Sequence, residues 1–296
     1  MAWSVLVWNM ARMSPDRPDR DEDNWAYFLD LVERLDVQIA LLNEASCAYL
    51  RGANAQAREQ GFPEPAVFSD IGTIARDPKT RKRWSAAVYS RLGPELLDAD
   101  SVRAQSEWRA AEIPFRPSRP GTWVAAKVPV GPESISSVAL YGLIEEFTDA
   151  SMHTSISEVS PLFNDPTYQG TILVGGDFNI GTALAGVDSR RSANVLERLE
   201  AYDLADCLET WRLKTGLPTL SGCPCRDDPC LHSLTRLYPA EPDSLTPWPE
   251  RIAPQVDYLF ASRELADRVS GVHEVPPEEW EQHSDHAPIV VEFEDP

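Results

Sequence analysis

The stretch TILVGGDFNI, residues 171–180, predicts both how the chain folds and where its chemistry lies. Its first four residues are β-branched or aliphatic, which is typical of a buried strand. The two glycines that follow allow a sharp turn, because glycine tolerates positive φ at little steric cost. Asp177 and Asn179 flank Phe178 and share one face if the chain stays extended. An Asp-x-Asn pair alone is more typical of a turn, so other stretches must decide between a turn and a site.

The size and composition of the chain favour one domain over residues 1–296, with a Cys/His-rich loop insertion at about 221–233. The chain has 296 residues and is 43% hydrophobic, and strand-like patterns recur along it without a linker-like break. Its net charge of −20 argues against tight, non-specific binding of duplex phosphates. A site built around divalent cations nevertheless needs carboxylates. A halophile-like acidic surface explains the charge equally well.

The cellular compartment is predicted from the apolar runs and the cysteines. No apolar run is long enough to span a bilayer, and the first ten residues, MAWSVLVWNM, lack a basic region and indicate a strand instead of a signal peptide. We therefore expect a cytoplasmic protein without a membrane span, whose five cysteines do not form a disulfide framework.

Apolar periodicity predicts strands that alternate with amphipathic helices. Asn24 is the expected N-cap of the first helix, whose apolar residues recur at helical spacing up to Leu35. Another helix is expected over Met152 to Phe163, and Leu204 to Thr210 is expected to be a short helix or connector. The expected strands cover residues 4–8, 37–42, 84–89, 122–130, 137–143, 171–174, 256–260 (with a turn at Ala261-Ser262) and the apolar run up to residue 293.

Polar side chains stand at or near the ends of these strands. They are Asn9, Glu44, Tyr141, Asp177 with Asn179, Asp257, and Asp285 with His286. Ligands gather at strand ends in α/β proteins, because loops converge there while the sheet holds positions rigid. Each residue alone is more often an ordinary solvated group, but the joint set of acids, amides and one histidine favours a catalytic site.

The motifs that carry these residues resemble the endonuclease/exonuclease/phosphatase superfamily across essentially the whole chain. In order, they are WNM (8–10), NEAS (43–46), LYGL (140–143), GGDFN (175–179), VDYLFAS (256–262) and SDHAP (284–288). The resemblance implies an α/β (α+β) fold. The expected architecture is a four-layer sandwich, in which two packed, mainly antiparallel sheets are flanked by helices. The combination of GGDFN with SDHAP is its most specific part.

The resemblance also implies metal-site roles for three residues. Glu44 is similar to the family's metal-binding glutamate, and Asp285 to the remaining acidic residue near the metal. A hard carboxylate site suits Mg²⁺ or Mn²⁺. Asn9 is similar to the asparagine that orients both the metal and the catalytic aspartate.

Four further residues are similar to those that act on the phosphate or orient the residues that do, and Tyr141 departs from the pattern. Asp177 resembles the residue that positions or deprotonates the attacking water, and Asn179 the one that hydrogen-bonds the phosphoryl oxygens. His286 resembles the histidine that contacts the scissile phosphate, with Asp257 fixing its tautomer. Tyr141 stands where the deoxyribonuclease and sphingomyelinase branches have a histidine, which leaves the branch and the substrate open. A phenol is a weak acid, so we expect it to hydrogen-bond the phosphate.

The sequence therefore predicts a divalent-metal-dependent phosphoesterase that cleaves phosphodiesters, with nucleic acid or nucleotides as the first expectation for its partner. The alternatives are a phosphatase or phosphodiesterase of a small phosphorylated metabolite or lipid headgroup, and a non-catalytic binding module. The acidic net charge favours a small substrate. Tyr141 favours nucleic acid, because the apurinic/apyrimidinic endonuclease branch of the superfamily has a tyrosine in a similar strand. The basic segment 76–83, if it is more than a solvated loop, also favours nucleic acid. The oligomeric state is left open.

A cluster of cysteines is the feature that the resemblance does not explain. Cys223, Cys225, Cys230 and His232 form C-x-C-x4-C-x-H in a segment rich in proline. Four such ligands within ten residues fit a closed tetrahedral Zn²⁺ site of structural role. The short C-x-C spacing also fits a redox thiol cluster or an unligated loop. Cys207 is expected to fill the core.

Overall fold

The computed structural model describes residues 2–10, 20–69, 84–99, 101–102, 115–144, 148–181, 187–216, 235–237, 252–253 and 255–295. The Cys/His-rich cluster and the basic segment 76–83 lie outside these residues.

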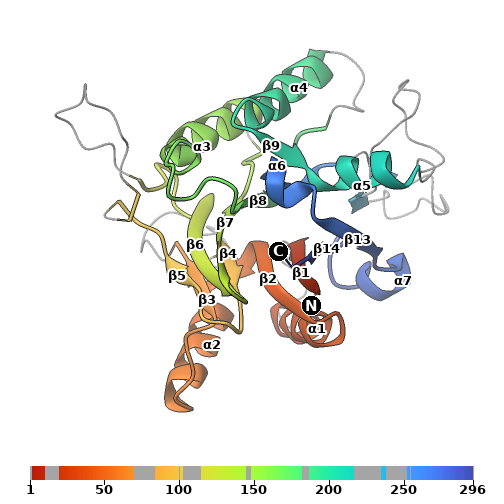
Figure 1. Cartoon of the computed structure of the whole chain (residues 1–296). Coiled ribbons are helices and arrows are strands. Elements are labelled where there is room, and N and C mark those ends of the chain that lie inside the picture. Colours follow the sequence, from red (N-terminus) through yellow and green to blue (C-terminus); the bar gives the residue numbers. More distant parts are fainter. Residues whose placement is uncertain are drawn as a thin grey trace.

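Two six-stranded sheets make up the centre of the molecule (Figure 1). The first has the order β13 (Val269–Glu274), β14 (Ile289–Glu294), β1 (Ala2–Asn9), β2 (Val37–Ser46), β4 (Trp84–Tyr89) and β3 (Ala66–Phe68). The second has the order β5 (Glu95–Leu96), β6 (Trp123–Val130), β7 (Glu133–Leu140), β8 (Ile172–Asp177), β12 (Asp257–Ser262) and β9 (Leu204–Asp206). Neighbouring strands are antiparallel except for β1–β2 and β7–β8. A separate short pair joins β10 (Arg236–Leu237) to β11 (Ile252–Ala253).

Helices cover the outer face of each sheet. Figure 1 shows α1 (Arg20–Arg34) and α2 (Cys47–Glu59) on one side, and α3 (Thr148–Phe163) and α4 (Val187–Glu200) on the other. The shorter helices are α5 (Cys207–Thr215), α6 (Arg263–Ala266) and α7 (Pro277–Trp280). The structure is thus the four-layer α/β sandwich that the resemblance implied, with mainly antiparallel sheets.

Alternation along the strands assigns the apolar side chains to different layers. In β1, Val5 and Val7 lie in the core between the sheets, whereas Leu6 and Trp8 pack with Phe28 of α1 on the outer face. Successive side chains of a strand point to opposite faces, and both faces of β1 are covered. This explains why β1 is apolar almost throughout.

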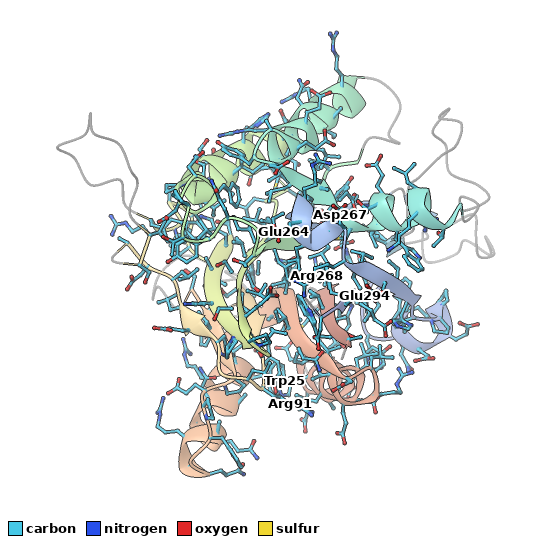
Figure 2. The ribbon with its side chains drawn as sticks, in the orientation of Figure 1. Trp25, Arg91, Glu264, Asp267, Arg268 and Glu294 are labelled. Carbon is cyan, nitrogen blue, oxygen red and sulfur yellow. The ribbon has the colours of Figure 1, made fainter. Side chains whose placement is uncertain are left out.

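Arg268 connects the two sheets at the end of the sandwich where β1 begins (Figure 2). Its Nη1 donates to Glu133 Oε2, in the first residue of β7, at 2.9 Å, and its Nε donates to the carbonyl of Glu294, in the last residue of β14, at 2.9 Å. The strand ends that carry the predicted site residues lie at the opposite end.

Two local predictions differ from the structure. Asn24 lies inside α1, where its Nδ2 donates to the carbonyl of Met10 at 2.7 Å instead of capping the helix. The segment that begins at Leu204 is strand β9 up to Asp206, and the expected short helix starts only at Cys207 as α5, because Asp206 caps it by accepting the backbone N–H of Leu208. Cys207 is fully buried, as expected for core filling, and Cys47 is buried too.

None of the helices in the described residues is both long enough and apolar enough to cross a bilayer.

Candidate active site

The predicted site residues come together where strands of both sheets end. Asn9 is the last residue of β1, and Asp177 is the last residue of β8. Asp257 begins β12 and is the register partner of Asp177, because the two strands are antiparallel. His286 precedes β14, which pairs with β1. Four segments far apart in the sequence thus deliver polar side chains to one end of the sandwich.

Asp177 lies at the centre of this group and is buried. Its Oδ2 accepts hydrogen bonds from Asn9 Nδ2 and Asn179 Nδ2, both at 2.8 Å, and its Oδ1 accepts the backbone N–H of Asn179 at 2.9 Å. Asn179 has a φ of 50°, a left-handed conformation that asparagine tolerates better than most residues. These three donors fix the orientation of the carboxylate.

His286 is held between two carboxylates. Its Nδ1 lies 2.9 Å from Asp257 Oδ2, so Nδ1–H donates to that carboxylate. Its Nε2 faces Asp177 Oδ2 at 3.7 Å. The hydrogen bond at Nδ1 fixes the imidazole so that Nε2 faces the carboxylate of Asp177 and any molecule bound to it.

Hydrogen bonds from neighbouring segments hold the His286–Asp257 pair in place. Ser284 Oγ donates to the carbonyl of Asn9 at 2.7 Å and accepts the backbone N–H of His286 at 3.0 Å. Thr235 Oγ1 accepts the backbone N–H of Asp257 at 3.0 Å, and its carbonyl accepts the N–H of Ala287 at 2.8 Å. Supporting contacts of this kind limit the motion of the imidazole.

Glu44 and Tyr141 form a second pair. Glu44 lies in β2 at an irregularity in its pairing with β4 and has a φ of 50°. The Tyr141 hydroxyl, just after β7, donates to Glu44 Oε1 at 2.8 Å. Glu44 Oε2 is buried and has no hydrogen-bond partner among the described residues. A buried carboxylate oxygen without a partner is costly, unless a cation or water binds it.

Asp285 differs from the other acids because it is 37% exposed. Its Oδ1 lies 4.0 Å from His286 Nε2, and its Oδ2 lies 3.5 Å from Arg236 Nε. Arg236 belongs to β10, and its backbone forms an isolated bridge with His286. The sequence reasoning gave no role to Arg236, since a single arginine in an irregular segment has no distinguishing pattern.

The donor set fits a hard divalent cation. One ligand atom from each of Asp177, Asp257 and His286 lies within 4.8 Å of the other two, but His286 can be a ligand only in its neutral form, whereas the neighbouring carboxylates favour its protonated form. Glu44 is not part of that group, but its Oε2, which has no hydrogen-bond partner among the described residues, could bind a cation. Oxygen-rich sites suit Mg²⁺ or Mn²⁺.

Asn43 is a further structural part of the site that sequence reasoning left without a role. It is fully buried, its Nδ2 donates to the carbonyl of Leu140 at 2.9 Å, and its Oδ1 accepts the N–H of Asp177 at 2.6 Å. It therefore links β2 of the first sheet to β7 and β8 of the second. The only sequence signal was a polar residue directly after an apolar run.

Gly176→Ala is expected to lower the free energy of unfolding by about 3 kcal/mol or more. Gly176 has a φ of 144°, and an added Cβ would lie 1.9 Å from the carbonyl oxygen of Leu140 and 2.5 Å from Asn43 Oδ1. Gly52→Ala is the matched control. Nothing lies within 4 Å of its Cβ position in α2, so that variant should gain up to about 1 kcal/mol of helix stability. Urea titrations of both variants measure the difference, and equal stabilities would contradict the close approach.

Without a bound cation, burial and the neighbouring charges raise the pKa values of Asp177, His286 and Tyr141, so the protonated form of each is favoured. Burial raises the pKa of Asp177 to about 7, against the lowering effect of His286. Burial alone would lower the pKa of His286, but the charges of Asp257 and Asp177 raise it to about 9. Burial and the charge of Glu44 raise the pKa of Tyr141 well above its ordinary value, so the phenol remains a hydrogen-bond donor at neutral pH.

The stability of metal-free Asp177→Asn relative to the parent is expected to rise with pH, from a starting point lowered by the amide N–H2 that meets one of the donors around Asp177. The pKa of Asp177 in the folded chain, about 7, lies above the value near 3.9 of an unfolded aspartate. The parent therefore loses stability as the pH rises from about 4 to about 7, since ionisation costs more in the folded state. The neutral amide has no such cost.

Thermal unfolding in EDTA at pH 5 and pH 8 measures this difference. We expect the stability of the variant relative to the parent to be on the order of 2 kcal/mol higher at pH 8 than at pH 5. Asp203→Asn is the control, because its exposed ion pair with Arg263 should contribute little at either pH. A gap that stays constant with pH would contradict the raised pKa of Asp177.

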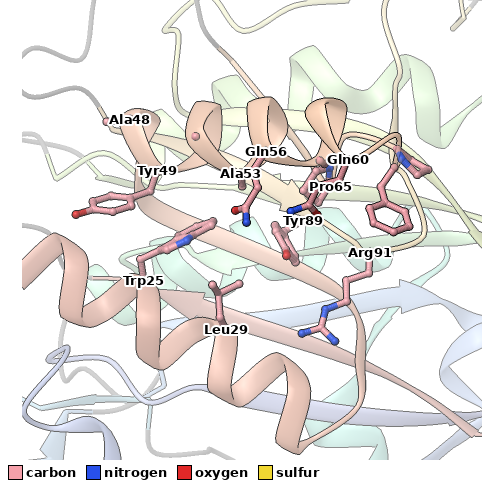
Figure 3. A pocket seen from close by; sticks show the side chains of 14 residues that line it. Trp25, Leu29, Ala48, Tyr49, Ala53, Gln56, Gln60, Pro65, Tyr89 and Arg91 are labelled. Atoms are coloured by element: carbon pink, nitrogen blue, oxygen red, sulfur yellow. The ribbon is translucent and has the colours of Figure 1, made fainter.

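A groove of about 910 Å³ lies elsewhere, between α1 and α2 (Figure 3). Its lining includes Trp25, Tyr49, Tyr89 and Arg91. None of the described residues that line it is an acid or a histidine, so it lacks the groups that hydrolysis needs.

Four predicted zinc ligands remain outside the described residues. They are Cys223, Cys225, Cys230 and His232. The zinc site stays a prediction.

Comparisons with known proteins identify the fold. No family model matches the chain, and no curated protein matches it by sequence. Solved structures match over nearly its whole length, and their common class is the endonuclease/exonuclease/phosphatase fold, which this chain therefore has. They include a family protein of that name from Leptotrichia buccalis, at 12% identity and a TM-score of 0.56, covering 99% of this chain and 100% of that one.

Two others are nucleic-acid enzymes by name. The 3′ phosphatase NExo from Neisseria is 16% identical, with a TM-score of 0.62, and the match covers 99% of this chain and 100% of that one. The AP endonuclease LMAP from Leishmania major is 14% identical, with a TM-score of 0.60, over 100% of this chain and 88% of that one. Identities this low bear on the fold alone.

Proposed function

We propose that this protein is a divalent-metal-dependent phosphoesterase that hydrolyses phosphodiester bonds in nucleic acid or nucleotides. The arrangement around Asp177 carries the proposal. A buried carboxylate, oriented by Asn9 and Asn179, faces a histidine whose other nitrogen is fixed by Asp257. Hydrolysis of a phosphate ester needs an oriented water and a donor near the phosphate, and these residues can supply both.

Asp177, His286 and Tyr141 have different roles because they differ in protonation state. Asp177 orients the attacking water and accepts its proton, because its carboxylate is fixed by three donors. His286 donates from Nε2 to the phosphate or the leaving oxygen, since its raised pKa keeps it protonated near neutral pH. Tyr141 remains a phenol and orients Glu44.

A Mg²⁺ or Mn²⁺ ion would be held by Glu44 together with neighbouring carboxylates, Asp177 and Asp285 being the candidates. When bound, it would offset the negative charge of the phosphate. Glu44 Oε2, which has no hydrogen-bond partner within the described ranges of the chain, supports this placement.

The expectation of a nucleic-acid substrate rests on the fold neighbours. NExo was solved with a product DNA hairpin, and TDP2 from D. rerio with a single-strand DNA product. The net charge of −20 favours the second candidate, a small phosphorylated metabolite, because a strongly acidic chain repels polyanions.

A substrate panel tests the proposal. Purified protein with Mg²⁺ or Mn²⁺ is incubated with single- and double-stranded DNA, abasic DNA, RNA, bis-p-nitrophenyl phosphate and simple monoesters. Asp177→Asn, prepared identically, controls for contaminating nucleases. Turnover of nucleic acid that Asp177→Asn lacks would support the first candidate, and turnover of small esters alone would support the second. If the parent turned over no phosphate ester, the chain would be a non-catalytic module and the proposal would be wrong.

A further inference from the structure

The amide of Asn179 has no free donor for a phosphate oxygen. Its two N–H groups are used by Asp177 Oδ2 and by the carbonyl of Gly142, both at 2.8 Å. Its oxygen accepts from Arg236 Nη1 at 3.1 Å. A primary amide has two donors, so this residue can bind phosphoryl oxygens directly only if it gives up a contact with its own chain.

Arg236 occupies the place next to this amide. Its backbone bridge to His286 and its pairing with Ala253 in β11 fix where the side chain starts. The guanidinium then reaches Asn179 with one nitrogen and approaches Asp285 with another at 3.5 Å. Its Nε is buried and lacks a hydrogen-bond acceptor within the described part of the chain. The side chain is 24% exposed, so it borders both the site and the solvent.

The guanidinium of Arg236 is a positive charge in a site that is rich in carboxylates. Asp177, Asp257 and Asp285 all act on His286 as negative charges. Arg236 lies close enough to lower the pKa of Tyr141, against the effect of Glu44. An anionic phosphate that enters such an acidic site needs fixed cations, and a planar guanidinium matches the geometry of two phosphate oxygens.

We propose that Arg236 binds the non-bridging oxygens of the substrate phosphate, and that Asn179 is a positioning residue that holds both Arg236 and Asp177. The substrate part of this inference rests on the proposed function. The oxygen of Asn179 fixes one edge of the guanidinium, and the terminal N–H groups that Asn179 does not use would donate to the phosphate.

Two variants of Arg236 and one control test this assignment. Arg236→Met removes the charge and the donors, whereas Arg236→Lys keeps the charge without the planar fork. Arg268→Met is the matched control, because that arginine is also part-buried and ion-paired but lies at the opposite end of the sandwich. Thermal unfolding shows whether each variant is folded, and Arg236→Lys carries the test if Arg236→Met is not.

Two measurements are made on each protein with Mg²⁺. They are the kcat and KM for the best ester of the panel, and the affinity for inorganic phosphate by ³¹P NMR titration. We expect Arg236→Met to lower kcat/KM by about 10²-fold, and to weaken phosphate binding by about tenfold or more. Arg236→Lys should retain part of both, and Arg268→Met should match the parent.

Phosphate affinity separates this inference from the proposed function. If the parent hydrolyses esters but Arg236→Met binds phosphate as tightly as the parent, the inference is wrong and the proposed function stands. A parent that hydrolyses nothing, yet binds phosphate in a way that depends on Arg236, would refute the function and support the inference. A parent that binds no phosphate overturns the inference.

Discussion

Asp177→Asn is expected to lower kcat by about 10²- to 10³-fold while the protein remains folded. The amide has the same shape as the carboxylate, but it cannot accept the proton of the attacking water. Two effects oppose each other in the fold: the neutral amide avoids the cost of a buried, ionised carboxylate, but its N–H2 group faces a donor that the carboxylate accepted from. Steady-state kinetics on the best substrate measures the loss, with parent and variant compared at equal concentrations of folded protein.

His286→Ala should cause a loss of similar size, but it is a less clean probe. Removing the imidazole leaves the buried carboxylate of Asp257 without its partner, which destabilises the fold as well. His286→Gln fills more of the space and separates the two effects. Kinetics near the parent rate for both Asp177→Asn and His286→Gln would rule out the assigned roles.

Removal of divalent cations is expected to abolish turnover completely and reversibly. EDTA should stop the reaction, and added Mg²⁺ or Mn²⁺ should restore it, because the site gathers more carboxylates than its own cations can offset. Full activity in EDTA would show that the residues work without a metal ion.

Glu44→Gln tests whether Glu44 is a ligand of the divalent cation that the reaction is expected to need. The variant keeps the size of Glu44 but removes the negative charge of the carboxylate, whose Oε2 has no partner in the part of the chain that the structure describes. It should therefore need more Mg²⁺ for half-maximal activity, by roughly tenfold or more. Glu279→Gln is the control, since that glutamate pairs with Arg34 at the surface. A Mg²⁺ requirement shared equally by both variants would exclude Glu44 as a ligand.

The element pattern was largely predictable, because its physical cause is local. The apolar run from Val37 to Leu42 lies within β2 as expected. The strand expected at 171–174 is present, but β8 continues through both glycines to Asp177 instead of turning there. The helix over Met152 to Phe163 appears within α3. Predictions fail where a side chain forms a hydrogen bond with another segment: Asn24 donates to the carbonyl of Met10 instead of capping its own helix.

The candidate site was predictable as a list of residues but not as a set of contacts. Motifs around Asn9, Asp177 and His286 named the groups, and the fold brings them together. The hydrogen bonds of Asn43 and Arg236 could not be read from the sequence, because each partner lies on another segment. The sheet order that makes them neighbours is a property of the whole chain.

By itself, the sequence determined which residue types stand at the strand ends, and motif resemblance added the class of fold. Strand ends are set by local apolar patterns, and so are their polar residues. Only the tertiary structure decided how these groups share their hydrogen bonds. It uses both N–H groups of Asn179 within the protein, and it places Arg236 beside that amide. Donors and acceptors are few and mutually exclusive, so their allocation depends on distances between segments that are far apart in the chain.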